Sequence, residues 1–420
     1  MSKLNFRPIR PCKAFLCLVA LFNAAPSLAA SQYRLVDLGT LGGPVSDAYA
    51  VNNGGIVGGT SWTSANGGDR PFLSAPNPTG PGQIYSIGSL FDAPGLASVR
   101  DIGDDGRAVG FSGPHAFITT SFPDGPGHMV DIGTLGGGSS EARAINSQGR
   151  VVGTAAIDEQ HTFAFISAPN PTGPGQLTNL GALGDGQGSA AFDINASNRV
   201  VGTSHYVPSN GDSPGSRAFI SLPDPTGGGQ LIDLGTMLGD EDSSFAYGIN
   251  DNGQVVGAAR SVSGETHAFI SQPNPTGIGQ LIDIGVNEFD SGAYGINSEG
   301  VVVGWMDTGE TTHAFVSDPS PTGQGHIYDL NSLLIENVFA FVLSEATAVN
   351  DNGQIVGWGF VQSRRHAFLL NPVTVPLPVS LVLFMAGVVP LALRSRRSKC
   401  DKLIAASAAR SPHHRDGHHP

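Results

Sequence analysis

The sequence predicts an all-β protein, a seven-bladed β-propeller built from seven repeats. An Ile-Asn or Val-Asn step followed by a glycine turn and Val-Gly recurs along the chain at spacings of 51, 43, 49, 55, 47 and 53 residues. Each repeat also carries four short apolar stretches separated by turn residues. A period of about fifty residues with four strands per unit fits propeller blades better than the shorter repeats of a solenoid. The steps lie at Asn52, Gly103 (in place of Asn), Asn146, Asn195, Asn250, Asn297 and Asn350.

The fifth repeat shows the expected strands in order. It reads AYGIN, the turn DNG, QVVGAA, HAFIS, the connection QPNPTGIG and QLIDIG. The Asn252-Gly253 pair predicts a tight hairpin between the first two strands, because glycine accepts the positive φ of such turns. The Pro-Thr-Gly segment predicts a longer connection before the fourth strand. Small and bulky residues alternate from Ala246 to Ile249, so we expect the bulky face of one sheet to pack on the small face of the next.

The two ends of the repeat region predict a closed ring. YRLVDLG at residues 33–39 matches the fourth strand of the other repeats but has no first three strands before it. The last repeat ends at HAFLL and lacks a fourth strand. We therefore expect the N-terminal strand to complete the last blade, which removes the free sheet edges that favour aggregation.

The composition of the repeats excludes several classes of function. Cysteines occur only at positions 12, 17 and 400, so the repeat region offers no thiol chemistry. Residues 31–373 contain 33 acidic and 11 basic side chains, a formal charge of −22. Such a surface argues against nucleic acid as a partner and against anionic membrane surfaces, whereas it permits divalent cations.

Residues 1–30 have the pattern of a secretory signal peptide. Basic residues precede the apolar run AFLCLVALF, and small residues follow it, with cleavage expected after Ala29 or Ala30. We therefore expect the repeat domain, residues 31–373, to be exported.

Residues 374–399 form a second targeting segment, and a polar, His-rich tail follows at 400–420. VPLP precedes an apolar stretch that is shorter than a usual membrane helix and contains Pro390, and a basic cluster follows. The arrangement resembles the PEP-CTERM sorting signals of exopolysaccharide-producing bacteria, in a VPLP variant. The resemblance implies an exosortase-type processing enzyme as a partner, with membrane association before cleavage. A plain membrane anchor is the alternative. The signal residues are Val375, Pro376, Leu377, Pro378, Arg394, Arg396 and Arg397.

The repeats themselves resemble HAF-type extracellular repeats. The resemblance rests on DLGTLGG at Asp37 and the similar DIGTLGG at Asp131, on AIN and GQVVG steps, and on His-Ala-Phe at His115, His267, His313 and His366. It implies an exported bacterial protein located at the cell surface or outside the cell. It implies no chemistry, because the family carries none that could be transferred.

Few residues are candidates for a catalytic or metal site. No nucleophile elbow, zinc-protease, phosphate-loop or dinucleotide motif occurs, so no catalytic residue is assigned and no cofactor is expected. The His-Ala-Phe histidines belong to different repeats, and structural hydrogen bonding is expected for them. The NDNG turns lack the ligands of a calcium loop. Calcium is the one possible cofactor, at Asp240, Glu241 and Asp242, although a solvated acidic loop is the simpler interpretation; bound calcium would make the melting temperature sensitive to chelator.

Three functions remain open. The leading hypothesis is a non-catalytic surface or matrix protein whose propeller binds exopolysaccharide or another surface component. The second is a polysaccharide hydrolase or lyase, for which the insertion after His205 in the fourth repeat is the place where one unit differs. The third is a protein-binding scaffold in envelope assembly.

Overall fold

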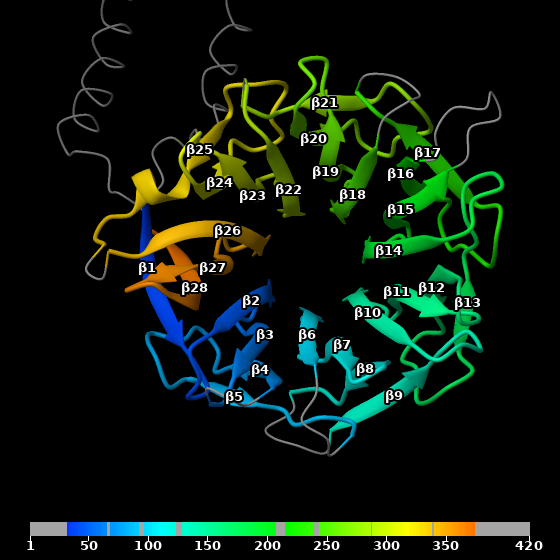
Figure 1. Cartoon of the computed structure of the whole chain (residues 1–420), viewed down its shortest axis with the longest axis horizontal. Helices are drawn as coiled ribbons and strands as arrows, with labels where there is room; N and C mark the ends of the chain where they lie inside the picture. Colours follow the sequence, from blue (N-terminus) through cyan, green and yellow to red (C-terminus); the bar gives the residue numbers. More distant parts are fainter. Residues whose placement is uncertain are drawn as a thin grey trace, which may run out of the picture. The chain divides into compact units, whose positions relative to one another are not determined.

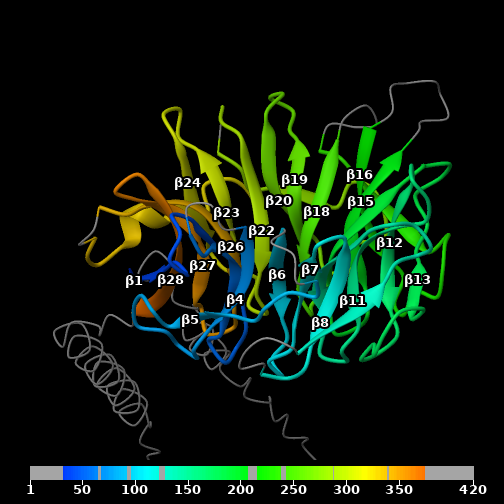
Figure 2. The same cartoon turned by 60° about the horizontal axis from the view of Figure 1, so that its bottom comes forward.

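The computed structural model describes residues 32–373, except 65–67, 92–95, 123–127, 207–214, 238–242, 287 and 338–339. These residues form seven antiparallel four-stranded sheets around a central axis (Figure 1). In the turned view of Figure 2, the sheets stand side by side around the ring. The predicted seven-bladed β-propeller is confirmed.

The strands of the first four blades follow one another in the chain, from the axis outward. Blade 1 is β2 (Ser46–Val51), β3 (Val57–Trp62), β4 (Asp69–Ser74) and β5 (Ile84–Ser86). Blade 2 is β6 (Ala97–Ile102), β7 (Ala108–Ser112), β8 (His115–Thr119) and β9 (Met129–Gly133). Blade 3 is β10 (Ser140–Ile145), β11 (Val151–Ala156), β12 (Thr162–Ser167) and β13 (Leu177–Asn179). Blade 4 is β14 (Ser189–Ile194), β15 (Val200–Tyr206), β16 (Gly215–Ser221) and β17 (Leu231–Gly235).

The last three blades end with the ring closure. Blade 5 is β18 (Ser244–Ile249), β19 (Val255–Arg260), β20 (Thr266–Ser271) and β21 (Leu281–Asp283). Blade 6 is β22 (Ser291–Ile296), β23 (Val302–Asp307), β24 (Thr312–Ser317) and β25 (Ile327–Asp329), and the 3-10 helix η2 (Leu330–Leu333) follows it. Blade 7 is β26 (Val342–Val349), β27 (Ile355–Val361), β28 (Arg364–Val373) and β1 (Gln32–Gly39).

The N-terminal strand closes the ring as the sequence predicts. β1 pairs with β28 from Gln32 opposite Val373 to Gly39 opposite Ala367. Figure 1 shows this junction as blue beside orange. β1 therefore supplies the fourth strand that the last repeat lacks, and main-chain hydrogen bonds hold the two ends of the described chain together.

The hydrophobic core lies between neighbouring blades. Phe269 of blade 5 packs with Val201 and Ile220 of blade 4, and Ile270 on the opposite face packs with Ala293 of blade 6. The third strand of each blade contributes an equivalent Phe with no exposed surface, and burying each of these side chains stabilises the fold by roughly 1.5–3 kcal/mol. These residues are Phe72, Phe117, Phe165, Phe219, Phe269, Phe315 and Phe368.

The first hairpin of each repeat differs in detail from the expected two-residue turn. In blade 5 the loop runs from Asn250 to Gln254, whose main chains are joined by a 3.1 Å hydrogen bond. Within this loop only Gly253 has a positive φ, of 76°, whereas a type I′ turn needs two such residues. The hairpin itself is correctly predicted; the loop is longer because Asn250 also caps it with its side chain, whose Oδ1 accepts the Gln254 N–H.

Helical membrane spans do not occur in the described part of the chain, where no helix is long and apolar enough to cross a bilayer. The predicted signal peptide and sorting segment, including Ala29, Ala30 and Val375 to Arg397, lie outside the described residues. They stay predictions.

Candidate functional site

A β-bulge interrupts the innermost strand of every blade. In β18, Ala246 pairs with Gly257 and Gly248 pairs with Val256, so Tyr247 is left between them without a partner. The expected alternation of Tyr247 with its neighbours is therefore wrong at this point. A bulge turns the extra side chain away from the faces that pack between sheets. The seven bulged residues are Tyr49, Arg100, Arg143, Phe192, Tyr247, Tyr294 and Thr347.

All seven bulged side chains line one cavity on the propeller axis, which we call the bulge ring. The cavity has a volume of about 570 Å³, within the range of small-ligand sites. Its other polar lining residues are Asp101, Asp193 and, from blade 7, Glu345, Trp358 and Arg365. Glu345 reaches this position because β26 carries a second bulge, between Leu343 and Glu345.

Aromatic rings form one side of the bulge ring. The Tyr247 ring centroid lies 5.3 Å from that of Phe192 and 5.4 Å from that of Tyr294, so three successive blades present a continuous aromatic surface. Burial raises the pKa of the Tyr247 and Tyr294 hydroxyls, which are therefore neutral donors at ordinary pH. This side of the cavity suits a flat, partly apolar ligand face.

Two arginines form a second side. Arg100 Nε and Arg143 Nη2 each donate to Glu141, at 2.9 Å, so one carboxylate serves two guanidinium groups. Arg100 also stacks on Tyr49, with its Cζ 4.6 Å from the ring centroid, and Arg143 lies over Phe192. Burial lowers the pKa of Arg143, and the nearby Arg100 charge lowers it further.

Blade 7 supplies a third side with Glu345 and Arg365, and Asp47 of blade 1 bonds Arg365 without lining the cavity. Asp47 accepts a hydrogen bond from Arg365 Nε, and the guanidinium of Arg365 lies 3.7 Å from the Trp358 ring centroid. Burial raises the pKa of Asp47 and of Glu345, although the charge of Arg365 opposes both shifts. Glu345 also forms side-chain hydrogen bonds with Trp358 and Tyr294.

A second cavity, of about 490 Å³, lies on the axis where the first hairpins of the repeats meet. It adjoins the first cavity at four residues that line both. They are Val51, Asp101, Ile296 and Val349. The axis therefore carries two cavities with different walls.

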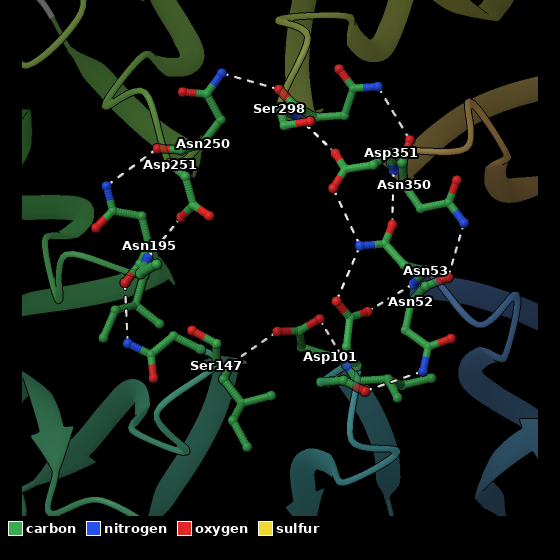
Figure 3. A pocket seen from close by; sticks show the side chains of 18 of the residues that line it. Asn52, Asn53, Asp101, Ser147, Asn195, Asn250, Asp251, Ser298, Asn350 and Asp351 are labelled. Carbon is green, nitrogen blue, oxygen red and sulfur yellow. Dashed lines mark hydrogen bonds between the residues drawn. The ribbon is translucent and has the colours of Figure 1, made fainter.

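The wall of the second cavity is a ring of asparagines, which we call the Asn ring (Figure 3). Each Asn of the repeat marker donates its Nδ2 to the main-chain oxygen at the same position of the next blade. The six hydrogen bonds are 2.9–3.2 Å long and run around the axis, from Asn350 to Asn52 across the closure. The donors are Asn52, Asn146, Asn195, Asn250, Asn297 and Asn350.

The Asn ring is interrupted at blade 2, where Gly103 has no side chain to donate. Here Asp101 connects the blades instead, because its Oδ2 accepts the N–H of Ile145 in blade 3 at 2.9 Å. Asp193 makes the equivalent link from blade 4 to Ile249 of blade 5 at 2.8 Å. The other blades carry Ala or Gly at this position.

These two aspartates have strongly shifted pKa values. Burial raises the pKa of Asp193 to about 8, and the charge of Asp101 adds to that shift, although two main-chain N–H groups oppose it. Burial raises the pKa of Asp101 to about 6. Both side chains line the cavity of the bulge ring and are partly exposed there, so water screens their charges in part.

Three other acidic residues of the second cavity serve as links between blades. Asp104 Oδ1 accepts the Asn53 N–H, Asp251 Oδ1 accepts the Ala196 N–H, and Asp351 Oδ1 accepts the Ser298 N–H, all at 2.8–2.9 Å. Across the described ranges, no three His, Cys, Asp or Glu side chains gather closely enough to hold a metal ion.

The structure places the other candidate residues as follows. The His-Ala-Phe histidines form the expected structural hydrogen bonds, each to an aspartate of the neighbouring fourth strand, as in His115 Nδ1 to Asp131 at 2.7 Å. The other pairs are His267 with Asp283, His313 with Asp329, and His366 with Asp37 across the closure. The proposed calcium ligands Asp240, Glu241 and Asp242 lie outside the described residues, as does most of the insertion after His205.

Sequence reasoning missed both rings. The Asn step served as a repeat marker and the NDNG turns were attributed to turn chemistry, but the Asn side chains also join the blades. The signal for the bulge ring was a residue type that changes between otherwise similar repeats: Tyr, Arg, Arg, Phe, Tyr, Tyr and Thr, two residues before each Ile or Val of the marker.

Comparisons with known proteins give a partial family match. A family model described as a protein of unknown function (DUF3466) matches residues 186–375. A sequence comparison with curated proteins found no significant match.

The chain is distantly similar to several solved structures. TolB from Acinetobacter baumannii is 12% identical with a TM-score of 0.38, over 60% of this chain and 62% of that one. Trypanosoma rangeli sialidase in complex with sialic acid is 12% identical with a TM-score of 0.30, over 80% of this chain and 57% of that one. The chain thus spans less than two thirds of either solved chain, and at these TM-scores the similarities carry no functional assignment.

Proposed function

We propose that the protein is an exported, non-catalytic polysaccharide-binding propeller and that the bulge ring is its binding site. The observation that supports this best is that six of the seven bulged side chains are planar aromatic or guanidinium groups facing one cavity. Sugar rings pack their apolar faces on aromatic rings and exchange hydrogen bonds with Arg, Tyr and carboxylate groups. The cavity offers both kinds of contact.

The carboxylates around the bulge ring support binding over hydrolysis. Glu141 is held by two arginines, Asp47 by Arg365, and Glu345 by Trp358 and Tyr294. Asp101 and Asp193 accept main-chain N–H groups. A glycosidase needs one carboxylic acid and one carboxylate flanking the scissile bond. In the described residues each of these groups already has a structural partner.

The test is a binding assay on the purified full chain with exopolysaccharide of the producing bacterium, in which the same mixtures are assayed for new reducing ends. Tyr247→Ala should weaken binding about tenfold, because stacking contacts of this kind contribute roughly 1–1.5 kcal/mol. Phe289→Ala, an exposed aromatic outside the cavity, is the matched control. New reducing ends would establish the hydrolase or lyase instead, and absence of binding would favour the protein scaffold.

The export route is a separate part of the proposal. We attribute it to the signal peptide, the resemblance to HAF repeats and the PEP-CTERM-like segment from Val375 to Arg397, with an exosortase-type enzyme as processing partner. Epitope tags placed before Val375 and after Lys399 should then separate in cells. Both tags on one membrane-bound band would favour a plain anchor.

A further inference from the structure

Charge is unevenly distributed around the bulge ring. On the side of blades 2 and 3, Arg100 and Arg143 share the single carboxylate Glu141. Asp101 and Asp193 also line the cavity, but their side chains accept the main-chain N–H groups of Ile145 and Ile249. On the opposite side, Glu345 and Arg365 of blade 7 line the cavity, and Asp47, which does not line it, accepts a hydrogen bond from Arg365. The cavity thus has one side with two arginines and an opposite side with the carboxyl group of Glu345.

The cationic side retains unused donors. A guanidinium has five N–H groups, and Arg143 makes one hydrogen bond, to Glu141, with its Nε buried and unpaired in the described structure. Arg143 and Arg100 keep 33% and 23% of their side-chain surface exposed, which leaves N–H groups open to a ligand. The repeat region holds only 11 basic residues and no lysine, so three arginines in one cavity is a marked concentration.

From these contacts we infer that the ligand of the bulge ring is an acidic saccharide, whose uronate carboxylate binds the Arg100–Arg143 pair. This inference rests on the proposed polysaccharide binding and names the class of sugar. One added carboxylate would accept hydrogen bonds from the guanidinium donors that Glu141 leaves unused, and arginine pairs with carboxylate through charge-assisted hydrogen bonds. On the opposite side, Glu345 accepts hydrogen bonds from the sugar hydroxyls. The apolar face of the ring lies against Phe192, Tyr247 and Tyr294 between the two.

The experiment compares two forms of one polymer on the purified full chain. The probes are the exopolysaccharide of the producing bacterium and the same preparation after carbodiimide activation and borohydride reduction, which converts uronates to neutral sugars. The native form should bind at least about tenfold more tightly, because a hydrogen-bonded charge contributes roughly 1.5–3 kcal/mol. The difference should shrink in high salt, since exposed charges are screened.

Substitutions then assign the difference to the arginine pair. Arg143→Gln should weaken binding of the native polymer at least about tenfold more than it weakens binding of the reduced polymer, because only the native polymer carries the carboxylate. An unchanged cooperative thermal transition shows that the variant is folded, and Arg100→Gln provides a second test of the pair. Arg260→Gln, an exposed arginine outside both cavities, should change neither affinity.

Each outcome separates the two proposals. If both polymers bind equally and Arg143→Gln does not change their relative affinity, the acidic saccharide is ruled out as the ligand, whereas the proposed polysaccharide binding stands. Tighter binding of the native form that Arg143→Gln and Arg100→Gln do not reduce would overturn the placement of the carboxylate. Binding of neither polymer would overturn polysaccharide binding itself.

Discussion

The Asn ring and the bulge ring come from the same seven strands, yet they differ in how far the repeats have diverged. Asn occupies the first ring in six of seven blades, whereas the second ring contains four different residue types. The Asn amide bonds the main chain of the next blade, and the main chain is the same in every repeat. A ligand on the axis does not require the same residue type in every blade. Repetition therefore marks the contacts that hold the blades together, and divergence marks the surface left for a ligand.

Removing residues 31–41 should have the largest effect, because it breaks the closure on which both rings depend. β1 forms an eight-residue strand against β28, and its loss exposes the edge of blade 7. We expect loss of the whole fold, measured as the absence of a cooperative thermal transition and of slowly exchanging amides. Removal of residues 1–30 alone is the control. Protection that persists in blades 2–5 would contradict a closed cooperative ring.

Asn250→Ala should separate stability from binding. The Asn250 side chain donates to the Asn297 carbonyl and to Gln254, and it accepts the Gln254 N–H. Its loss leaves buried main-chain groups unpaired at a cost of roughly 1–3 kcal/mol, which lowers the melting temperature by a few degrees. Polysaccharide affinity should stay within about twofold, opposite to the result expected for Tyr247→Ala. Equal loss of affinity in both variants would mean that the two rings act as one site.

Asp193→Ala should change how stability depends on pH. The folded-state pKa of Asp193, about 8, is raised above the ordinary value of 3.8, so the fold favours the protonated form. The stability contributed by this group is therefore complete below pH 3.8 and is lost as pH rises through 8. The wild-type melting temperature should fall between pH 5 and 9 by on the order of 2 °C from this group, and the variant should show a flatter profile.

Asp101→Ala is the comparison for that pH profile. The pKa of Asp101 is raised only to about 6, so its contribution should be lost in a lower pH range than that of Asp193. If the melting temperatures of wild type and Asp193→Ala depend on pH in the same way, water in the cavity solvates the Asp193 carboxylate fully.

The fold could be predicted from the sequence because each of its determinants is local and repeated. Asn-Gly turns, the Phe of each third strand and the unmatched strand at residues 33–39 specify hairpins, core and closure. The His-Asp pairs follow once the strands are in register. The bulge ring could not be predicted in the same way, because one extra residue in a strand reverses the faces of its neighbours. Alternation around Tyr247 suggested a side chain between sheets, and only the pairing of Gly248 with Val256 shows otherwise.

Gly103→Asn should have the smallest effect and tests whether the Asn ring is purely structural. The new Nδ2 would donate to the Asn146 carbonyl and supply the missing seventh bond, for a gain of about 0.5–1.5 kcal/mol and a rise of about 1–3 °C in melting temperature. A Cβ at this position meets Asp105 Oδ1 at 3.0 Å, and that exposed carboxylate must move slightly.

Gly103→Ala separates the two possible sources of that gain. Alanine adds the same Cβ and restricts the unfolded chain, but it offers no amide to Asn146. If alanine raises the melting temperature as much as asparagine does, the gain comes from the unfolded state and the seventh bond contributes nothing. If only asparagine does, the Asp101 link from blade 2 to Ile145 is a substitute for the missing bond and not an equal of it. The seam between blades 2 and 3 would then be the weakest in the Asn ring, next to the two arginines to which we assign the carboxylate.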